Sequence, residues 1–290
     1  MKKTLFILTA ILALASCSKE QYSAVNDSNE ISFNFGFPGQ TKATATAFEN
    51  GDAVSLYAVE YNGSTQMPLQ VGGNYFNNEK LTFNGTSWAG TRSLYWSSSA
   101  CDFYALYPYQ VSIGSIEDYP FSVATDQDSN DGAGYEASDL LYASATNVSS
   151  SAGSVSLNFN HMMSKVIVNL VKGDNFEGEI PDNVVAHVYN TTTSCNVDWT
   201  KGSVEKDAFG SKNTITMKKI SNSQFEAVLV PQNIERSTPL IELTMSGIAY
   251  LLETSLSFLP GYAHTITVTL NTSPDQEQIE ISIDPSIHNW

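Results

Sequence analysis

The sequence predicts an all-β protein built as two tandem β-sandwich domains. Short segments in which apolar and polar residues alternate recur along the 290 residues, as strands with one buried face require. These segments are rich in valine, isoleucine, threonine and aromatic residues, which fit the pleated surface of a sheet. Turn residues such as Pro38-Gly39 and Asn84-Gly85 separate them, and helical periodicity is almost absent.

The N-terminus predicts export and attachment to lipid. Two lysines precede an apolar stretch that is shorter than the roughly 20 residues of a membrane-spanning helix and is typical of a secretory signal. This stretch ends in Leu-Ala-Ser-Cys, which is similar to a lipobox, so we expect a signal peptide over residues 1–16 and acylation of Cys17. The polar residues 17–30 then predict a lipidated tether.

The charge of the chain limits its partners. Its formal net charge is −16, and removal of the two lysines in the signal makes the exported protein still more negative. This balance argues against nucleic acid and against electrostatic binding to anionic lipid. We therefore expect a self-repelling surface protein that reaches outer-membrane lipid only through the acyl chains on Cys17.

The predicted strands share strict alternation or a continuous run of β-branched and aromatic residues. Pro108 should end the pairing of its strand, because proline lacks the backbone N–H that a ladder needs. In chain order, we expect strands over 31–37, 53–59, 80–83, 102–108, 155–159, 165–170, 184–189, 225–230, 240–245, 248–258, 263–270 and 279–283.

A change in composition suggests where the two domains meet. Residues 125–154 are rich in serine, glycine and aspartate and interrupt the strand pattern. We place the boundary near residue 150, which gives an N-terminal domain over 31–150 and a C-terminal domain over 151–290. Both have ordinary domain sizes. A single elongated sandwich is the alternative.

Two cysteines remain after the lipidated one. Cys101 and Cys195 lie far apart in the sequence, and spacing alone does not show whether they meet in space. We expect two small buried thiols. A disulfide is the alternative, since an exported chain meets an oxidising compartment.

Six short segments follow one another in an order that a known family shares. They are FENGD at 48–52, Trp96 with DFYALYPY at 102–109, DLLYA at 139–143, LNFNHMMSKV at 157–166, AVLVPQ at 227–232, and FLPGY at 258–262 leading into TVTL at 267–270. Together, behind a lipobox, they resemble the fimbrillin-like proteins, the subunits of type V pili in Bacteroidota.

The resemblance implies a fold, a location and a mode of assembly. It implies two transthyretin-like sandwich domains, export as a lipoprotein to the outer membrane and cell surface, and a place in a fimbrium beside other fimbrial subunits. It also implies contact with a host or bacterial surface receptor. In the family's stalk subunits a trypsin-like protease cuts after a basic residue in an early loop. The first strand then leaves, and a neighbour's terminal strand fills the groove.

The first predicted strand, 31–37, is the candidate leaving strand. A strand withdrawn from a sheet leaves unpaired backbone groups and an apolar slot, which another extended segment can fill. The alternation of this strand should place four apolar side chains on one face. These are Ile31, Phe33, Phe35 and Phe37.

The segment 279–287, which contains the last predicted strand, is the candidate donor strand. Ile279, Ile281 and Ile283 fall on one face of it, and Trp290 ends the chain. The alternative is that both terminal strands are permanent edge strands of the chain's own sheets.

The loop after the leaving strand contains Lys42, where the family often has arginine. An arginine-specific protease would not cut after this residue, whereas a protease that accepts lysine would. Lys42 is therefore the candidate processing site. An uncut subunit would suit an anchor, a tip or a surface protein outside any pilus.

Residues for catalysis or metal binding form no recognised pattern. The nucleophile-elbow, phosphate-loop and dinucleotide motifs are absent from the sequence. The acidic run 126–132 begins like a calcium loop, but its glycine is displaced by one position and Ala137 stands where glutamate is needed. We predict no enzyme, no metal site and no cofactor. None of the four histidines has metal-ligand spacing: His161, which we interpret as a hydrogen-bonded structural residue, His187, His264 and His288.

Two other functions stay open. A non-polymerising, glycan-binding surface lipoprotein would need a row of exposed aromatic rings for stacking on sugars. A secreted hydrolase would need a cleft with converging carboxylates. The aromatic residues that could form the row are Tyr95, Trp96, Phe103, Tyr104, Tyr107 and Tyr109.

Overall fold

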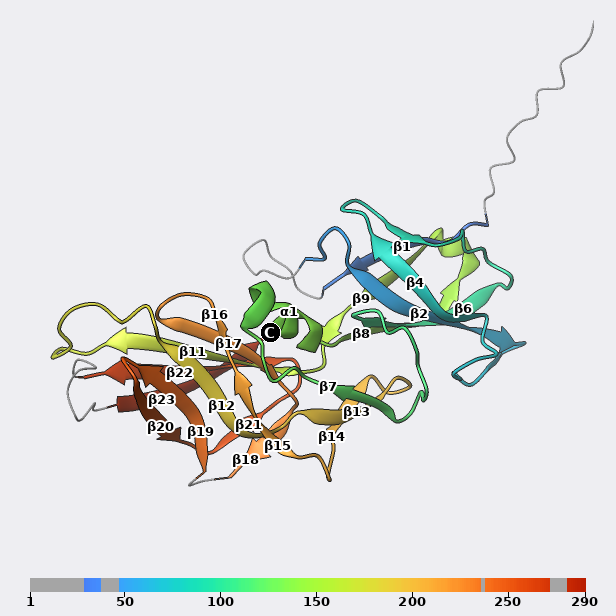
Figure 1. The fold of residues 1–290 in the computed structure, drawn as a ribbon. Helices are drawn as coiled ribbons and strands as arrows, with labels where there is room; N and C mark the ends of the chain where they lie inside the picture. Colours follow the sequence, from blue (N-terminus) through green and yellow to red (C-terminus); the bar gives the residue numbers. More distant parts are fainter. Residues whose placement is uncertain (1–28, 38–46, 236–237, 272–280) are drawn as a thin grey trace, which may run out of the picture.

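The regular structure of the described residues is almost entirely β-strand. This computed structural model describes residues 29–37, 47–235, 238–271 and 281–290. Among them, one α-helix occurs, α1 (Ser129–Ser138), with a short 3-10 turn over Ser150–Ala152. Figure 1 shows two groups of strands with α1 near their junction. The predicted all-β class is therefore confirmed.

The first group is a sheet covered on one face by two further strands. Its order is β10-β8-β6-β2-β4-β5, with the short β3 (Thr65–Gln66) paired to β2. The covering strands β1 (Ser32–Gly36) and β9 (Ser154–Asn158) pair in parallel. The sheet contains β2 (Ala53–Asn62), β4 (Phe76–Phe83), β5 (Trp88–Gly90), β6 (Ala100–Tyr107), β8 (Leu141–Ser149) and β10 (Asn160–His161).

The second group contains two larger sheets and two small ones. The larger sheets have the orders β16-β17-β11-β22-β23 and β15-β12-β19-β20, and the small ones are β14-β13-β7 and β18-β21. Their bounds are β7 (Tyr119–Ser122), β11 (Ser164–Lys172), β12 (Val185–Thr192), β13 (Ser194–Asp198), β14 (Ser203–Lys206), β15 (Lys212–Thr216), β16 (Lys218–Lys219), β17 (Gln224–Leu229), β18 (Gln232–Ile234), β19 (Pro239–Met245), β20 (Ile248–Glu253), β21 (Leu256–Phe258), β22 (Tyr262–Leu270) and β23 (Ile281–Asn289).

Strands β2 and β6 are buried on both faces. One face, with Leu56 and Phe103, packs against β1 and β9 in a cluster that we call the first core. The other face, with Tyr57 and Tyr104, packs into the cluster that fills the second group of strands, the second core. Because both faces of these strands are buried, their sequences are nearly continuous apolar runs. As predicted, β6 ends just before Pro108.

Trp199 lies where the sheet of the first group meets the second core. Its ring packs edge-on against Tyr57 of β2, with ring centroids 5.4 Å apart. The hydroxyl of Tyr142 in β8 donates a hydrogen bond of 2.7 Å to the backbone carbonyl of Trp199. Trp199 is fully buried. These contacts join the sheet of the first group directly to the second core.

The expected division near residue 150 does not coincide with the division between the two cores. Strand β7, which precedes residue 150, pairs with β13 of the second group. Strand β9, which follows it, pairs with β1 and contributes Val155 and Leu157 to the first core. Strands on each side of residue 150 thus belong to the other group. Composition did not predict this exchange, because it marks surface segments, whereas strand partners depend on pairing between distant parts of the chain.

The segment expected to interrupt the strand pattern contains regular structure. It holds α1 and then β8, which pairs with β6 in the middle of the first sheet. Inside α1, Asn130, Asp131 and Gly132 have positive φ angles. Asparagine, aspartate and glycine tolerate this conformation better than other residues, so the turn-like composition and the irregular helix have the same cause.

Candidate functional site

The candidate leaving strand forms β1 and the residues next to it. From Ser32 to Gly36 it pairs in register with β9. The amide of Ile31 donates to the carbonyl of Leu94 at 2.7 Å, and the amide of Phe159 donates to the carbonyl of Gly36 at 2.8 Å. Main-chain bonds therefore hold this strand from its start to its end.

The side chains of β1 alternate between solvent and the first core. Ser32 and Asn34 are exposed, Ile31 is buried, and Phe33 and Phe35 are half-buried against the core. The ring of Phe35 lies 4.8 Å from Trp88 and 5.5 Å from Phe159, between centroids. These rings line an apolar slot that the strand fills.

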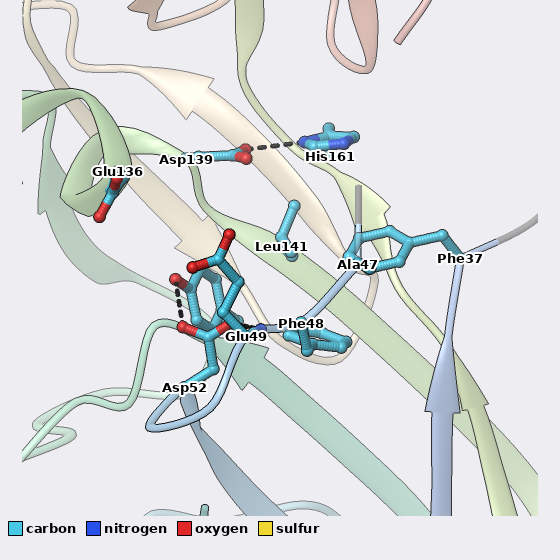
Figure 2. Close-up of a pocket in the computed structure, with 10 residues that line it drawn as sticks. Phe37, Ala47, Phe48, Glu49, Asp52, Glu136, Asp139, Leu141 and His161 are labelled. Carbon is cyan, nitrogen blue, oxygen red and sulfur yellow. Dashed lines mark hydrogen bonds and ion pairs between the residues drawn. The ribbon is translucent and has the colours of Figure 1, made fainter. Parts of the chain in front are cut away.

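A pocket lies at the end of this strand. It has a volume of about 190 Å³, and Figure 2 shows four carboxylates around it, those of Glu49, Asp52, Glu136 and Asp139. The pocket is thus acidic, with aromatic rings among its walls. The other lining residues are Phe37, Ala47, Phe48, Tyr107, Leu141 and His161.

Two of these carboxylates already bond to the protein. Asp52 accepts hydrogen bonds from the backbone amide of Glu49 at 2.7 Å and from the hydroxyl of Tyr107 at 3.1 Å. Asp139 accepts from Nδ1 of His161 at 2.7 Å. Burial, and then the charge of Asp52, raise the pKa of Tyr107. Asp52 and Asp139 therefore hold a turn and an imidazole in place.

The candidate donor strand forms β23 at the end of the order β16-β17-β11-β22-β23. It pairs antiparallel with β22, from Leu270 opposite Ile281 to Tyr262 opposite Asn289. Residues 286–289 are exposed. Ile279 lies outside the described residues, as do Cys17 and Lys42.

The chain ends against His161. The indole of Trp290 stacks on the imidazole of His161 with centroids 3.9 Å apart and planes 14° apart. The amide of Trp290 donates to the carbonyl of Gly261 at 3.0 Å, and Nζ of Lys165 lies 5.8 Å from the Trp290 ring. Figure 1 places the C-terminus near the junction of the two groups of strands.

The acidic run 126–132 forms a turn and part of α1. The Oδ1 atom of Asp126 accepts hydrogen bonds from the amides of Asp128 and Ser129. The buried side chain of Gln127 exchanges two hydrogen bonds of 2.8 Å with the backbone of Val228. Within the described ranges, histidine, cysteine and acidic side chains form no group of three that could hold a metal ion.

The six aromatic residues proposed for sugar stacking do not form an exposed row. Trp96, Phe103 and Tyr104 are buried, whereas 40% of Tyr95 is exposed. Trp96 meets Phe103 edge-on, with planes 86° apart. Packing in the cores, rather than contact with a ligand, accounts for the buried rings.

The two cysteines are separate buried thiols. Burial, and then the charge of Asp207, raise the pKa of Cys195 to about 12. Burial likewise raises the pKa of Cys101. The disulfide alternative is therefore wrong for this fold.

Sequence reasoning missed the contacts that gather around His161. Its partners Asp139 and Trp290 come from distant parts of the chain, and only folding brings them together. Two signals were present in the sequence: His161 and Asp139 lie in two of the six family-like segments, and a tryptophan ends the chain. Within the described residues, the helix is not long and apolar enough to cross a membrane.

Comparison with known proteins points to one family. Over 200 residues, the chain is 28% identical to a Bacteroides ovatus protein named "Putative fimbrium tip subunit Fim1C". The match covers 59% of this chain but only 36% of that relative, so the chain spans little more than a third of its length.

Solved structures share the fold. A "putative cell adhesion protein" from Bacteroides uniformis has a TM-score of 0.68 at 19% identity, covering 90% of this chain and 98% of its own. Another from Bacteroides ovatus has a TM-score of 0.69 at 18% identity, covering 90% and 96%. A fimbrial protein from Bacteroides ovatus has a TM-score of 0.52 at 22% identity, covering 86% and 51%. At these identities the likeness shows the fold alone.

The family model described as fimbrillin-like matches residues 41–290 of this chain. This match includes the sheet of the first group, the second core and the C-terminal strand. This chain therefore belongs to the fimbrillin-like family.

Proposed function

We propose that this chain is a structural and adhesive subunit of a cell-surface fimbria and that it assembles by β-strand exchange. The observation that carries this proposal is the position of the two terminal strands. Strand β1 fills an aromatic slot in the first core, and β23 lies at the end of a sheet order. One strand can therefore vacate a groove, and the other can detach to fill the groove of a neighbour.

The slot under β1 suits an incoming strand. If β1 left, Trp88, Phe103 and Phe159 would lose ring partners, and the backbone of β9 would lose its parallel partner. Exposed apolar rings and unpaired backbone groups are unfavourable in water. A strand with apolar side chains at alternate positions would restore both kinds of contact.

The position of β23 suits a donor. It can separate from β22 without disrupting the pairing between β22 and β11, because it ends the strand order. Ile281 and Ile283 occupy alternate positions in the register with β22. An apolar residue at every second position is the pattern that the groove left by β1 would accept.

We further propose that the chain is exported as an outer-membrane lipoprotein through acylation of Cys17. Membership of a fimbrial family supports a location at the cell surface. The sequence Leu-Ala-Ser-Cys at the end of the apolar stretch supports the lipid anchor. Lys42 is the proposed site of processing in subunits that polymerise.

The pocket next to β1 does not change this proposal to an enzyme. Its carboxylates converge, as a hydrolase would require, yet Asp52 and Asp139 already accept hydrogen bonds from Tyr107 and His161. The first bond fastens the end of β6 to the start of β2, and the second fastens β10 to the segment before β8. We therefore propose a structural rather than a catalytic role for both aspartates.

Mass spectrometry of the mature N-terminus tests processing. Protein shaved from the cell surface should begin at Ala43 if the chain is cut after Lys42 and polymerises. Lys42→Gln, which removes the basic residue, should abolish that N-terminus. An acylated Cys17 as the sole N-terminus would instead indicate an uncut anchor, tip or monomer and would contradict polymerisation through loss of β1.

Electrophoresis without boiling tests strand exchange. We expect SDS-resistant ladders from the processed protein, and their loss when residues 281–290 are deleted or when Ile281 and Ile283 are both changed to serine. Ser286→Ala, at an exposed position of β23, is the matched control and should keep the ladders. Ladders that survive the isoleucine substitutions would show that β23 is not the donor.

A further inference from the structure

We propose that His161 couples the two terminal strands, so that loss of the N-terminal strand loosens the C-terminal strand. This inference rests on the proposed function, in which both strands exchange. It concerns a switch within one subunit: removal of Phe37 with the leaving strand weakens the contact that holds Trp290. The subunit would then release its own donor strand only after it has been processed.

The first half of the coupling is the contact between Phe37 and His161. Phe37 directly follows β1, and its ring lies 6.0 Å from the imidazole with planes 25° apart. The same ring packs 4.9 Å from Phe48. Phe37 and His161 also line the same pocket. Loss of the leaving strand would remove this wall and admit water beside the imidazole.

The second half is the contact between His161 and Trp290. The stack at 3.9 Å is the closest ring contact within the described residues, and it joins the last residue of the chain to β10. Trp290 also packs against the second core, whereas residues 286–289 are exposed. The hold on the end of β23 therefore depends strongly on Trp290.

The imidazole can transmit the change because its environment fixes its orientation. Its side chain is 4% exposed, and its Nδ1 donates to Asp139 at 2.7 Å. An aromatic stack is sensitive to the distance and tilt of the two rings. If the wall formed by Phe37 is lost, the imidazole gains room to tilt, and the stack with Trp290 weakens.

Hydrogen exchange measured on the full chain tests the coupling. In Phe37→Ala, the amides of a peptide covering 281–290 should exchange about three- to tenfold faster, which corresponds to the loss of part of an aromatic contact. Phe33→Ala is the matched control. It removes a half-buried ring from β1 that packs on Phe103 and that, among the described residues, makes no ring contact with His161.

Three further variants test the same contact by hydrogen exchange. Phe37→Leu retains an apolar side chain without a ring and should also accelerate exchange, which covers the case that Phe37→Ala does not fold. Trp290→Ala should accelerate exchange by itself. Adding Phe37→Ala to Trp290→Ala should then produce little further change, because both substitutions act through one contact.

Two results would overturn the coupling. Unchanged exchange of 281–290 in both Phe37 variants would show that the two strands are independent. Equal acceleration by Phe33→Ala and Phe37→Ala would show only a general loss of stability. These outcomes are distinguishable from failure of the proposed function: coupling without ladders would refute fimbrial assembly alone, whereas ladders without coupling would refute this inference alone.

Discussion

The two terminal strands are held in different ways. Strand β1 lies over the first core, pairs with β9 and places aromatic rings against Trp88, Phe103 and Phe159. Strand β23 ends a sheet order and exposes residues 286–289, with Trp290 as its anchor. Strand β1 is therefore held mainly by rings packed in the first core, whereas β23 is held by main-chain pairing with β22 and by Trp290.

The largest expected difference is between a ring of β1 that packs on the first core and an exposed side chain of β23. Phe35→Ala should lower the free energy of unfolding by about 3 kcal/mol, because it removes a large side chain packed between two aromatic rings. Ile287→Ala, at a position that is 52% exposed, should change it by less than about 0.5 kcal/mol. Urea denaturation measures both. Equal costs would contradict the difference between the strands.

The next effect concerns local opening. We expect the amides of β23 to exchange with solvent at least about tenfold faster than those of β1, because the rings of β1 pack in the first core whereas residues 286–289 of β23 are exposed. Hydrogen exchange with mass spectrometry of the native protein measures this ratio. Peptides from β22 serve as the control, because β22 pairs with β11 on its other side. Equal protection of β1 and β23 would show that the packed rings of β1 add nothing to the protection of its amides.

We expect acid to lower the free energy of unfolding through His264 in β22. His264 in β22, opposite Ile287, is buried, and its Nε2 accepts a hydrogen bond of 3.0 Å from the amide of Leu259. Burial, and then the charge of His288, lower the pKa of His264 from its ordinary value of 6.5. The unfolded chain therefore binds this proton at a higher pH than the native chain does, and the free energy of unfolding falls as the pH drops below about 6.5.

Urea denaturation at pH 7.5 and pH 5.5 checks this sign. The wild-type chain should lose more stability between these two values than His264→Leu, which carries no titratable group at that position. A matching loss in the variant would assign the pH dependence to other groups, such as the carboxylates. Retained stability in the wild-type chain at pH 5.5 would contradict the burial of neutral His264.

The smallest effect tests the solvent face of β1. The hydroxyl of Ser32 donates to the carbonyl of Gly153 at 3.0 Å in an exposed position. Ser32→Ala should lower the free energy of unfolding by no more than about 0.5–1 kcal/mol, because water replaces the lost hydrogen bond. Urea denaturation measures the change beside Phe35→Ala. A cost as large as that of Phe35→Ala would mean that polar contacts, rather than the rings, hold β1.

Local pattern predicted the longest strands apart from β8, but it missed many short strands, such as β13 and β15, and it did not predict strand partners. The alternation over 31–37 and the apolar run over 53–59 correspond to β1 and β2. The pattern did not predict β8, because only its first residues are apolar and the rest resemble a polar loop. Neither did it predict α1, whose residues with positive φ interrupt any helical period.

The pocket and the contacts of His161 could not be predicted because they join distant segments. Phe37, Asp139, His161 and Trp290 are separated by many strands in the sequence. The motifs indicated that the regions around His161 and Asp139 matter, yet no spacing rule places a C-terminal indole on that imidazole. The pairing of β1 with β9, of β8 with β10 and of β22 with β23 brings them together.

Composition and local periodicity were enough to predict the all-β class, the acidic charge and the two terminal strands with apolar residues at alternate positions. The tertiary structure decided that β1 covers an aromatic slot while β23 lies at an edge, and that the two strands end near one histidine. Such contacts depend on long-range strand pairing, which follows from the best joint burial of all apolar faces rather than from any one segment.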